Sequence, residues 1–154
     1  MPSRCGGKAS SARAERRSPR ICRLSDYTIK NLLTDVDDAA EQFGLAPDIE
    51  ARFAREPLDS QKFGLSFQRL SPNTRFPYGH HHHEQEEVYV VVAGSGRVKL
   101  DDDVHELRVW DAVRVGKDTV RSFEAGPDGL AFLAFGAPKT ESQDAEMIPG
   151  WWSD

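Results

Sequence analysis

The sequence has few cysteines and no long apolar run. Cys5 and Cys22 are its only two cysteines among 154 residues, and both lie near the N-terminus. Neither a disulfide framework nor a cysteine-based zinc site is therefore expected to support a core, and a reducing, cytoplasmic location fits best. The longest apolar run is residues 88–93. We therefore expect no membrane-spanning helix and no membrane partner, because such a helix needs roughly 20 apolar residues.

Several catalytic motifs are also missing. The sequence has no Gly-x-Ser-x-Gly turn, no phosphate-binding P-loop, no dinucleotide-binding glycine pattern and no Cys-x-x-Cys pair. Nucleophilic hydrolysis, nucleotide binding and thiol redox chemistry therefore lack support. Residues 101–103 are three consecutive aspartates, but the spaced glutamate and glycine of a calcium loop do not accompany them. We interpret this run as a hairpin turn.

The charge is unevenly distributed. Residues 1–24 hold seven of the 20 basic residues and only one of the 25 acidic residues. This stretch is rich in Ser, Gly, Ala and Arg and has too few large apolar residues to offset the entropy cost of ordering, so we predict a disordered basic tail. The rest of the chain is acidic, which argues against a nucleic-acid surface on the folded part. Any nucleic-acid partner would contact the tail.

Residues 25–60 show short helical patterns. Apolar residues recur at helical spacing before Gly44 and predict a helix over residues 35–43. A second short helix is predicted between Pro47 and Pro57. Both are too short to be stable alone, so we expect this N-terminal segment to pack on a larger unit.

From residue 61 onward the pattern changes to alternation and short β-branched runs separated by turn residues, as expected of a small barrel or sandwich. The predicted fold is all-β, with a barrel over residues 61–137 and a C-terminal tail over 138–154. We expect Trp151 and Trp152 to dock back on the barrel, because adjacent exposed tryptophans would form an adhesive patch. The predicted strands are residues 62–70, 77–82, 86–93, 96–101, 104–108, 112–115, 120–125 and 129–136.

Four of the five histidines are consecutive, and Glu87 follows them closely. Imidazole and carboxylate ligands suit Mn, Fe, Zn and Ni. Alternation along a strand places either His80 with His82 or His81 with His83 on one face, so one pair can point inward. The alternative is a solvated polyhistidine loop that binds metal only weakly.

The stretch from Gly79 to Gly94 resembles the first motif of the cupin family. That motif reads His-x-His, three or four residues, Glu, six residues, Gly. The spacing to Gly94 places the motif carboxylate at Glu87. The resemblance covers about residues 62–137. It implies a double-stranded β-helix, or jelly roll, with a central pocket for a small molecule.

The resemblance also implies a divalent metal site. With a four-residue gap the histidine ligands are His80 and His82, and with a three-residue gap they are His81 and His83. The Gly-His-x-His reading that precedes a Glu-Glu-Val-Tyr strand favours His80 and His82, with Glu87 as the third ligand. The metal would be Mn, Fe, Zn or Ni.

The second cupin motif departs from the family pattern at every named position. It normally reads Gly, five residues, Pro-x-Gly, two residues, His, three residues, Asn, and its histidine completes the metal site. The lengths of the flanking strands are retained, which keeps the fold assignment. The residues at the five named positions are Trp110, Gly116, Asp118, Arg121 and Ala125.

Arg121 stands where the last histidine ligand belongs. A guanidinium stays protonated and has no lone pair for a metal, so Arg121 cannot be a ligand. If it points inward, it can pair with Glu87 or bind a carboxylate or phosphate of a substrate; otherwise it is solvated at the rim. We predict Arg121, Tyr89 and Phe123 as substrate-binding residues. His105 lies on a predicted hairpin strand and is expected to be structural or exposed.

Three functions follow from these features. The first is a cupin that binds a small molecule beside a metal held by two histidines and one glutamate, with oxygenase, isomerase or lyase chemistry open to it. The second is a metal-free sensor or carrier that binds a small organic anion through Arg121. The third is an interaction module whose basic tail binds nucleic acid. The strand over residues 87–92 is apolar on both faces, which predicts a homodimer.

Overall fold

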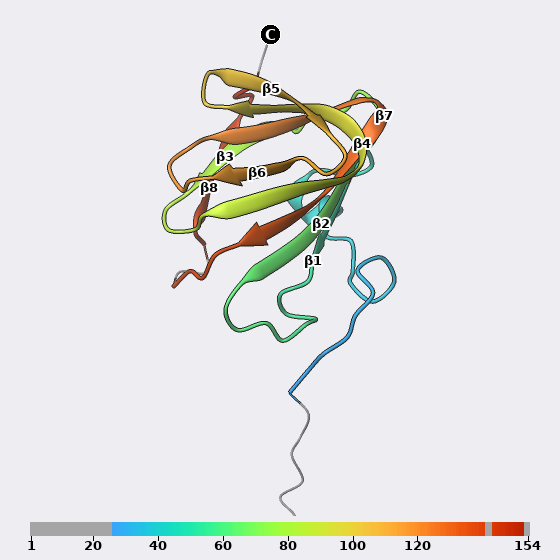
Figure 1. The fold of residues 1–154 in the computed structure, drawn as a ribbon, viewed down its shortest axis with the longest axis vertical. Coiled ribbons are helices and arrows are strands. Elements are labelled where there is room, and N and C mark those ends of the chain that lie inside the picture. The colour runs from blue at the N-terminus through green and yellow to red at the C-terminus, as the bar shows by residue number, and fades with distance from the viewer. Residues whose placement is uncertain (1–25, 141–142, 153–154) are drawn as a thin grey trace, which may run out of the picture.

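The computed structural model describes residues 26–140 and 143–152, so Cys5, Cys22 and the predicted disordered tail lie outside the described residues. The described chain is a curled, all-β jelly roll (Figure 1), as predicted. Its strands are β1 (Ile49–Phe53), β2 (Gly64–Leu70), β3 (Tyr78–His82), β4 (Glu87–Leu100), β5 (Asp103–Arg108), β6 (Ala112–Val115), β7 (Arg121–Gly136) and β8 (Ala145–Pro149).

Two long strands, β4 and β7, join the two faces of the jelly roll. Residues 87–93 of β4 pair with residues 131–136 of β7, and β6, β2 and β1 extend this face. Residues 96–100 of β4 pair with residues 121–125 of β7, and β5, β3 and β8 extend the opposite face. Every pairing is antiparallel, so one curled sheet forms both walls of the barrel.

The expectation that β4 and β7 would each be two strands separated by a glycine turn is wrong. β4 runs through Gly94 with an irregular register on both sides of it. Gly94 has a φ of 72°, and a Cβ there would lie 2.0 Å from the carbonyl oxygen of Gly129 on β7. Glycine therefore lets the two strands bend together at close approach without ending either of them.

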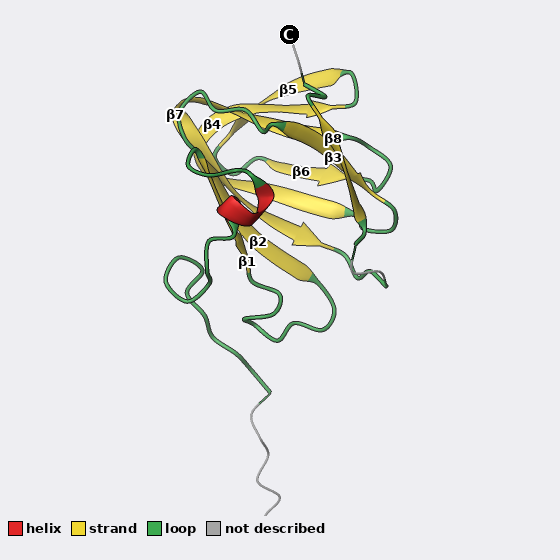
Figure 2. Cartoon of the chain, turned by 180° about the vertical axis from the view of Figure 1, so that it is seen from behind, coloured by secondary structure: helices red, strands yellow, loops and turns green. Residues whose placement is uncertain are grey.

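The helical predictions for the N-terminal segment are mostly wrong. Only a four-residue 3₁₀ turn forms, at Ala40–Phe43, and Gly44 ends it with a φ of 67°. It is the single helix in Figure 2 and the only one among the described residues, so no helical element there reaches the length of a bilayer crossing. The second predicted helix is instead β1, an edge strand on β2. Burial of Ile49 and Ala51 on alternate positions follows the strand period, which a helical spacing from Ile49 to Phe53 conceals.

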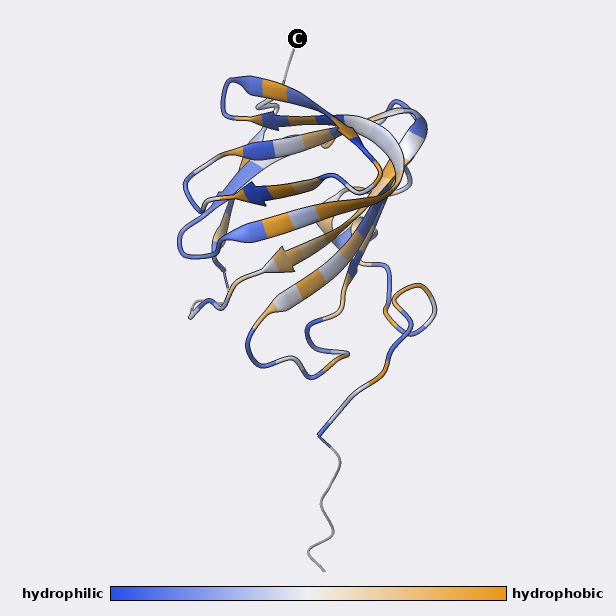
Figure 3. Cartoon of the chain, viewed as in Figure 1, coloured by the Kyte–Doolittle hydropathy of each residue, from blue (hydrophilic) through white to orange (hydrophobic). Residues whose placement is uncertain are grey.

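The core lies between the two faces, and hydrophobic and hydrophilic residues alternate along the strands that enclose it (Figure 3). Three aromatic rings pack together at its centre: Phe123 lies 4.5 Å from Phe132 and 4.8 Å from Tyr89, measured between ring centroids. Burial of large rings contributes much of the driving force for folding such a small barrel. This cluster also forms the support behind the candidate site.

The C-terminal segment returns to the barrel. β8 was not predicted, and it pairs antiparallel with β3 from Tyr78 opposite Pro149 to His82 opposite Ala145. Trp152 is buried, with Arg75 over its ring at 4.7 Å. The predicted docking is thus confirmed for Trp152. The pairing matters for function because β3 carries the histidines.

Candidate metal and ligand site

The structure places His80 and His82 on the inner face of β3, next to Glu87 at the start of β4. One ligand atom from each of these three residues lies within 4.8 Å of the others. His81 is partly buried beside Glu146, and His83 is exposed. Strand alternation therefore brings together the pair that the Gly-His-x-His reading favours, and the short β3–β4 connection brings the carboxylate to it.

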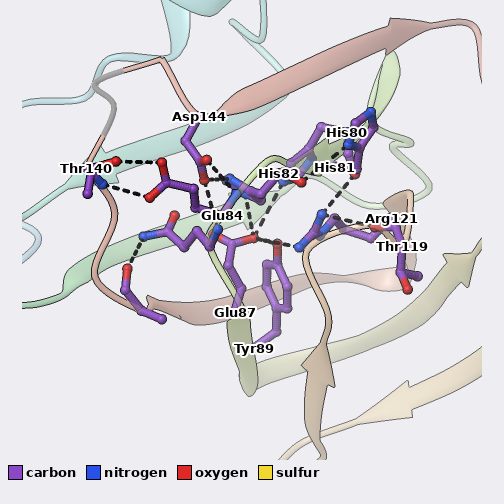
Figure 4. Close-up of polar contacts among 12 residues, drawn as sticks. His80, His81, His82, Glu84, Glu87, Tyr89, Thr119, Arg121, Thr140 and Asp144 are labelled. Atoms are coloured by element: carbon purple, nitrogen blue, oxygen red, sulfur yellow. Dashed lines mark hydrogen bonds and ion pairs between the residues drawn. The ribbon is translucent and has the colours of Figure 1, made fainter.

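Glu87 is the centre of this group (Figure 4), and its Oε2 is the atom that the other side chains approach. His82 Nε2 lies 3.1 Å from Oε2, and His80 Nε2 lies 3.6 Å from it. The Nη2 atom of Arg121 is 3.5 Å from the same oxygen, and the Tyr89 hydroxyl donates a hydrogen bond to it. The side chain of Glu87 is 13% exposed, so these interactions are poorly screened by water.

His82 is oriented by a residue from the C-terminal segment. Its Nδ1 lies 2.8 Å from Oδ2 of the fully buried Asp144. A proton on Nδ1, donated to this carboxylate, leaves the lone pair of neutral imidazole on Nε2. Nε2 is buried and has no hydrogen-bond partner among the described residues. A lone pair facing a carboxylate oxygen at 3.1 Å requires a cation, either a proton or a metal ion, between the two atoms.

The histidines and Glu87 form part of the wall of a cavity of about 350 Å³. Tyr89 also lines it, whereas Arg121 and Phe123, predicted with Tyr89 to bind substrate, are not among its lining residues. Both are buried behind the wall, Phe123 in the aromatic cluster and Arg121 beside Glu87. Only Tyr89 of the three therefore reaches the cavity itself.

The family model for the cupin domain matches residues 66–133. The chain contains a cupin domain. Its structure is similar to a cupin protein from Bacteroides fragilis (20% identity over 78% of this chain and 91% of that one, TM-score 0.62) and to KdgF from Halomonas sp. (17%, 72% and 94%, 0.56). Oxalate decarboxylase from Bacillus subtilis is also similar (20%, 77% and 32%, 0.61). At these identities the likeness shows the fold, and no curated protein matches the chain.

Arg121 of the cupin domain stands where the second motif has a histidine. Its Nη1 donates to the carbonyl oxygens of His80 and Thr119, at 3.2 and 3.0 Å. Its Nε and Nη2 have no hydrogen-bond partners among the described residues, although Nη2 lies near Glu87. Arg121 therefore places a fixed positive charge beside the carboxylate. It balances the charge of Glu87 and opposes a second cation nearby.

The protonation states in this cupin suit metal ligation. Burial alone would raise the pKa of Glu87, but its interactions with His80 and His82 outweigh that effect and hold the pKa well below its usual range. Burial lowers the pKa of His80, and the positive charge of Arg121 acts in the same direction. An ionised carboxylate and a neutral imidazole are the forms that bind a metal.

Several residues of the site were not predicted from the sequence. Asp144 lies in the stretch interpreted as a C-terminal tail, and Arg55 and Lys139, which line the cavity, come from segments on either side of the predicted barrel. Each is distant in sequence from the histidines, so no local spacing signalled it. His105, which was expected to be either structural or exposed, is exposed on β5.

Proposed function

We propose that this cupin domain binds a small molecule in the barrel beside a divalent metal ion held by His80, His82 and Glu87. The observation that carries the proposal is the buried, unpartnered Nε2 of His82, which faces the Glu87 carboxylate and lies close to His80. A buried polar atom without a partner costs about 1–3 kcal/mol, so a native site is expected to supply one. A metal ion satisfies the two imidazoles and the carboxylate together.

The donor set fits Mn, Fe, Zn or Ni, because two imidazoles and a carboxylate suit all four metals. Three protein ligands leave positions open, and a metal bound there would polarise a water or substrate oxygen. Tyr89 donates a hydrogen bond to Glu87 and fixes the carboxylate, while Arg121 places a positive charge 3.5 Å from its Oε2. These residues set the geometry and charge of the site before any ligand arrives.

The cavity indicates the chemistry of the small molecule. Aromatic residues including Phe53 and Tyr78 line it, and Glu87 is its only acidic lining residue among those described. Arg55 and Lys139 contribute positive charge to the same wall. Since Arg121 already balances Glu87, the cavity favours a ligand with an apolar or aromatic body and an anionic group.

Metal titration of untagged protein stripped with EDTA tests the metal site. Calorimetry with Mn²⁺ and Zn²⁺ is expected to show one ion per chain, and a variant with both His80→Ala and His82→Ala should lose this binding. The matched control carries His81→Ala and His83→Ala, which removes the same number of imidazoles from the outer face. Equal binding by the two double variants, or none by the parent protein, would overturn the proposal.

Thermal shift with benzoate and benzamide tests the anionic ligand. The two molecules share a ring, and only benzoate is charged, so benzoate should stabilise the protein more. Arg55→Gln should reduce this difference, while Arg108→Gln, on a residue outside the cavity wall, should not. Equal shifts with both molecules would contradict the assigned ligand class.

The unpartnered Nε and Nη2 of Arg121 favour a second candidate, a metal-free carrier or sensor of small anions. Arg121 is buried behind Glu87, so in this function a ligand carboxylate would have to displace the Glu87 side chain and take its place beside the guanidinium. Stabilisation by benzoate should then persist in EDTA and disappear in Arg121→Met. Stabilisation that needs added metal would instead favour the metal site.

A further inference from the structure

We infer that Asp144, the residue directly before strand β8, is a positioning residue of this site. The expected effect on metal binding rests on the proposed function, whereas the contact between Asp144 and His82 does not depend on a metal. Asp144 Oδ2 lies 2.8 Å from His82 Nδ1, on the side of the ring opposite Glu87. The carboxylate thus selects the tautomer with its proton on Nδ1 and aims Nε2 at Glu87.

The Asp144 carboxylate is itself fixed. Its Oδ1 accepts the backbone N–H of Glu84 at 2.8 Å, and its Oδ2 accepts that of Gln85 at 3.1 Å. Its carbonyl oxygen accepts the N–H of His83 at 3.0 Å. With both oxygens bonded and no exposed surface, the carboxylate has no freedom to rotate away from His82.

These contacts hold the whole connection between β3 and β4. That connection separates His82 from Glu87, so its shape sets the distance between two of the ligands. Nearby, Gln85 Nε2 donates to the carbonyl oxygen of Ala137 at 2.6 Å, and Thr140 Oγ1 donates to Glu84 at 2.6 Å. Residues of the segment that follows β7 therefore hold the β3–β4 connection by hydrogen bonds at both Glu84 and Gln85.

Strand pairing explains why Asp144 reaches His82. In the β3–β8 register His82 lies opposite Ala145, the residue after Asp144. Asp144 lies outside residues 66–133, which the family model matches. The positioning carboxylate therefore comes from the C-terminal segment, whereas the three ligands lie within the matched residues.

A carboxylate bonded to the far nitrogen of a metal-binding histidine fixes the ring and makes it a stronger ligand. Removing such a partner typically weakens metal affinity by about 10- to 100-fold. Asp144→Asn keeps the volume of the side chain but removes its charge. Thr140→Ala is the matched control, because it loosens the same connection through Glu84 without touching His82.

The decisive measurement is ¹⁵N NMR of the His82 ring in metal-free protein, with the signal assigned by its loss in His82→Gln. We expect Nδ1 to carry a proton in the parent protein and in Thr140→Ala, and the Nε2–H tautomer to increase in Asp144→Asn. Zinc affinity should fall about 10- to 100-fold in Asp144→Asn and less than twofold in Thr140→Ala. The parent measurement does not depend on Asp144→Asn, so it can still overturn the inference if that variant fails to fold.

A His82 ring in the parent protein that carries its proton on Nε2 alone would overturn the inference. So would an Asp144→Asn variant that folds and matches the parent in both tautomer and zinc affinity. If the parent binds no zinc while the tautomer depends on Asp144, the positioning role stands and the metal proposal fails. The two failures are therefore distinguishable.

Discussion

Glu87 and Glu124 are both half-buried carboxylates on strands of the barrel, and each lies beside arginine. Glu124, on β7, receives hydrogen bonds from Arg75 and from Arg97, whose Nε lies 3.2 Å away. Trp152 covers both guanidinium groups, at 4.7 and 5.5 Å from its ring. This group of charges has its donors and acceptors matched, which is the arrangement of a structural ion-pair network.

Glu87 lacks this match. Its carboxylate accepts a hydrogen bond from the Tyr89 hydroxyl, while His82 Nε2 and two nitrogens of Arg121 nearby are buried without hydrogen-bond partners among the described residues. An arginine beside a glutamate therefore does not by itself distinguish a structural pair from a binding site. Polar atoms left without partners make that distinction.

The largest expected difference between the two carboxylates is in metal binding. Glu87→Ala removes one of three ligands and should weaken zinc affinity at least 100-fold, whereas Glu124→Ala should change it less than twofold. Calorimetric titration of both EDTA-stripped variants measures the effect. Comparable losses of zinc affinity in the two variants would show that the metal does not bind preferentially at Glu87.

Replacing the arginine beside each carboxylate by histidine should increase the difference in zinc affinity between the Glu87 and Glu124 sites. Arg121→His removes a fixed positive charge near Glu87 and supplies an imidazole at the position of the missing family ligand, so zinc affinity should rise at least tenfold. Arg97→His, beside Glu124, is the control and should leave affinity unchanged. A weaker site in Arg121→His would mean that Arg121 supports metal binding.

Glu124, in contrast, should matter for the stability of the fold. Glu124→Gln breaks a network of two charged hydrogen-bond donors and should lower the free energy of unfolding by about 1–2 kcal/mol, after discounting for its partial exposure. Glu106→Gln, on an exposed position of β5, should change it by less than about 0.5 kcal/mol. Urea denaturation measures both, and equal midpoints for the two variants would contradict the structural role of Glu124.

The smallest predicted effect is a pH dependence. Burial alone would raise the pKa of Glu124, but hydrogen bonds from Arg97 and Arg75 lower it below its usual range. A carboxyl whose pKa is lower in the folded state stabilises the protein above its unfolded pKa of about 4.3 and loses that contribution as pH falls through the folded value. The Tm difference between the parent and Glu124→Gln should therefore shrink below about pH 4.5. A difference that stays constant into acid would contradict this assignment.

The sequence predicts the parts of the site that depend on local spacing. Alternation along one strand and the fixed distance from Glu87 to Gly94 are enough to bring His80, His82 and Glu87 together. Asp144 could not be found this way, because a pairing between β3 and β8 brings it to His82 from 62 residues away. Its importance depends on tertiary structure and has no local pattern.

The fold shows the same limit. The alternating strands of the barrel were predictable, but a glycine with positive φ reads as a turn in sequence, and at Gly94 it bends a continuous strand. Residues 49–53 fit a helical spacing as well as a strand period. Only the free edge of β2 decides between these readings, since it offers backbone hydrogen bonds to a strand.

Anomalous diffraction from crystals soaked in zinc, recorded at the zinc absorption edge, tests the central claim most directly. We predict one strong peak per chain, bounded by Nε2 of His80, Nε2 of His82 and the carboxylate of Glu87. The contradictory result is a map without a peak there, in which His82 Nε2 donates directly to Glu87 and the charges of the site are matched as they are around Glu124.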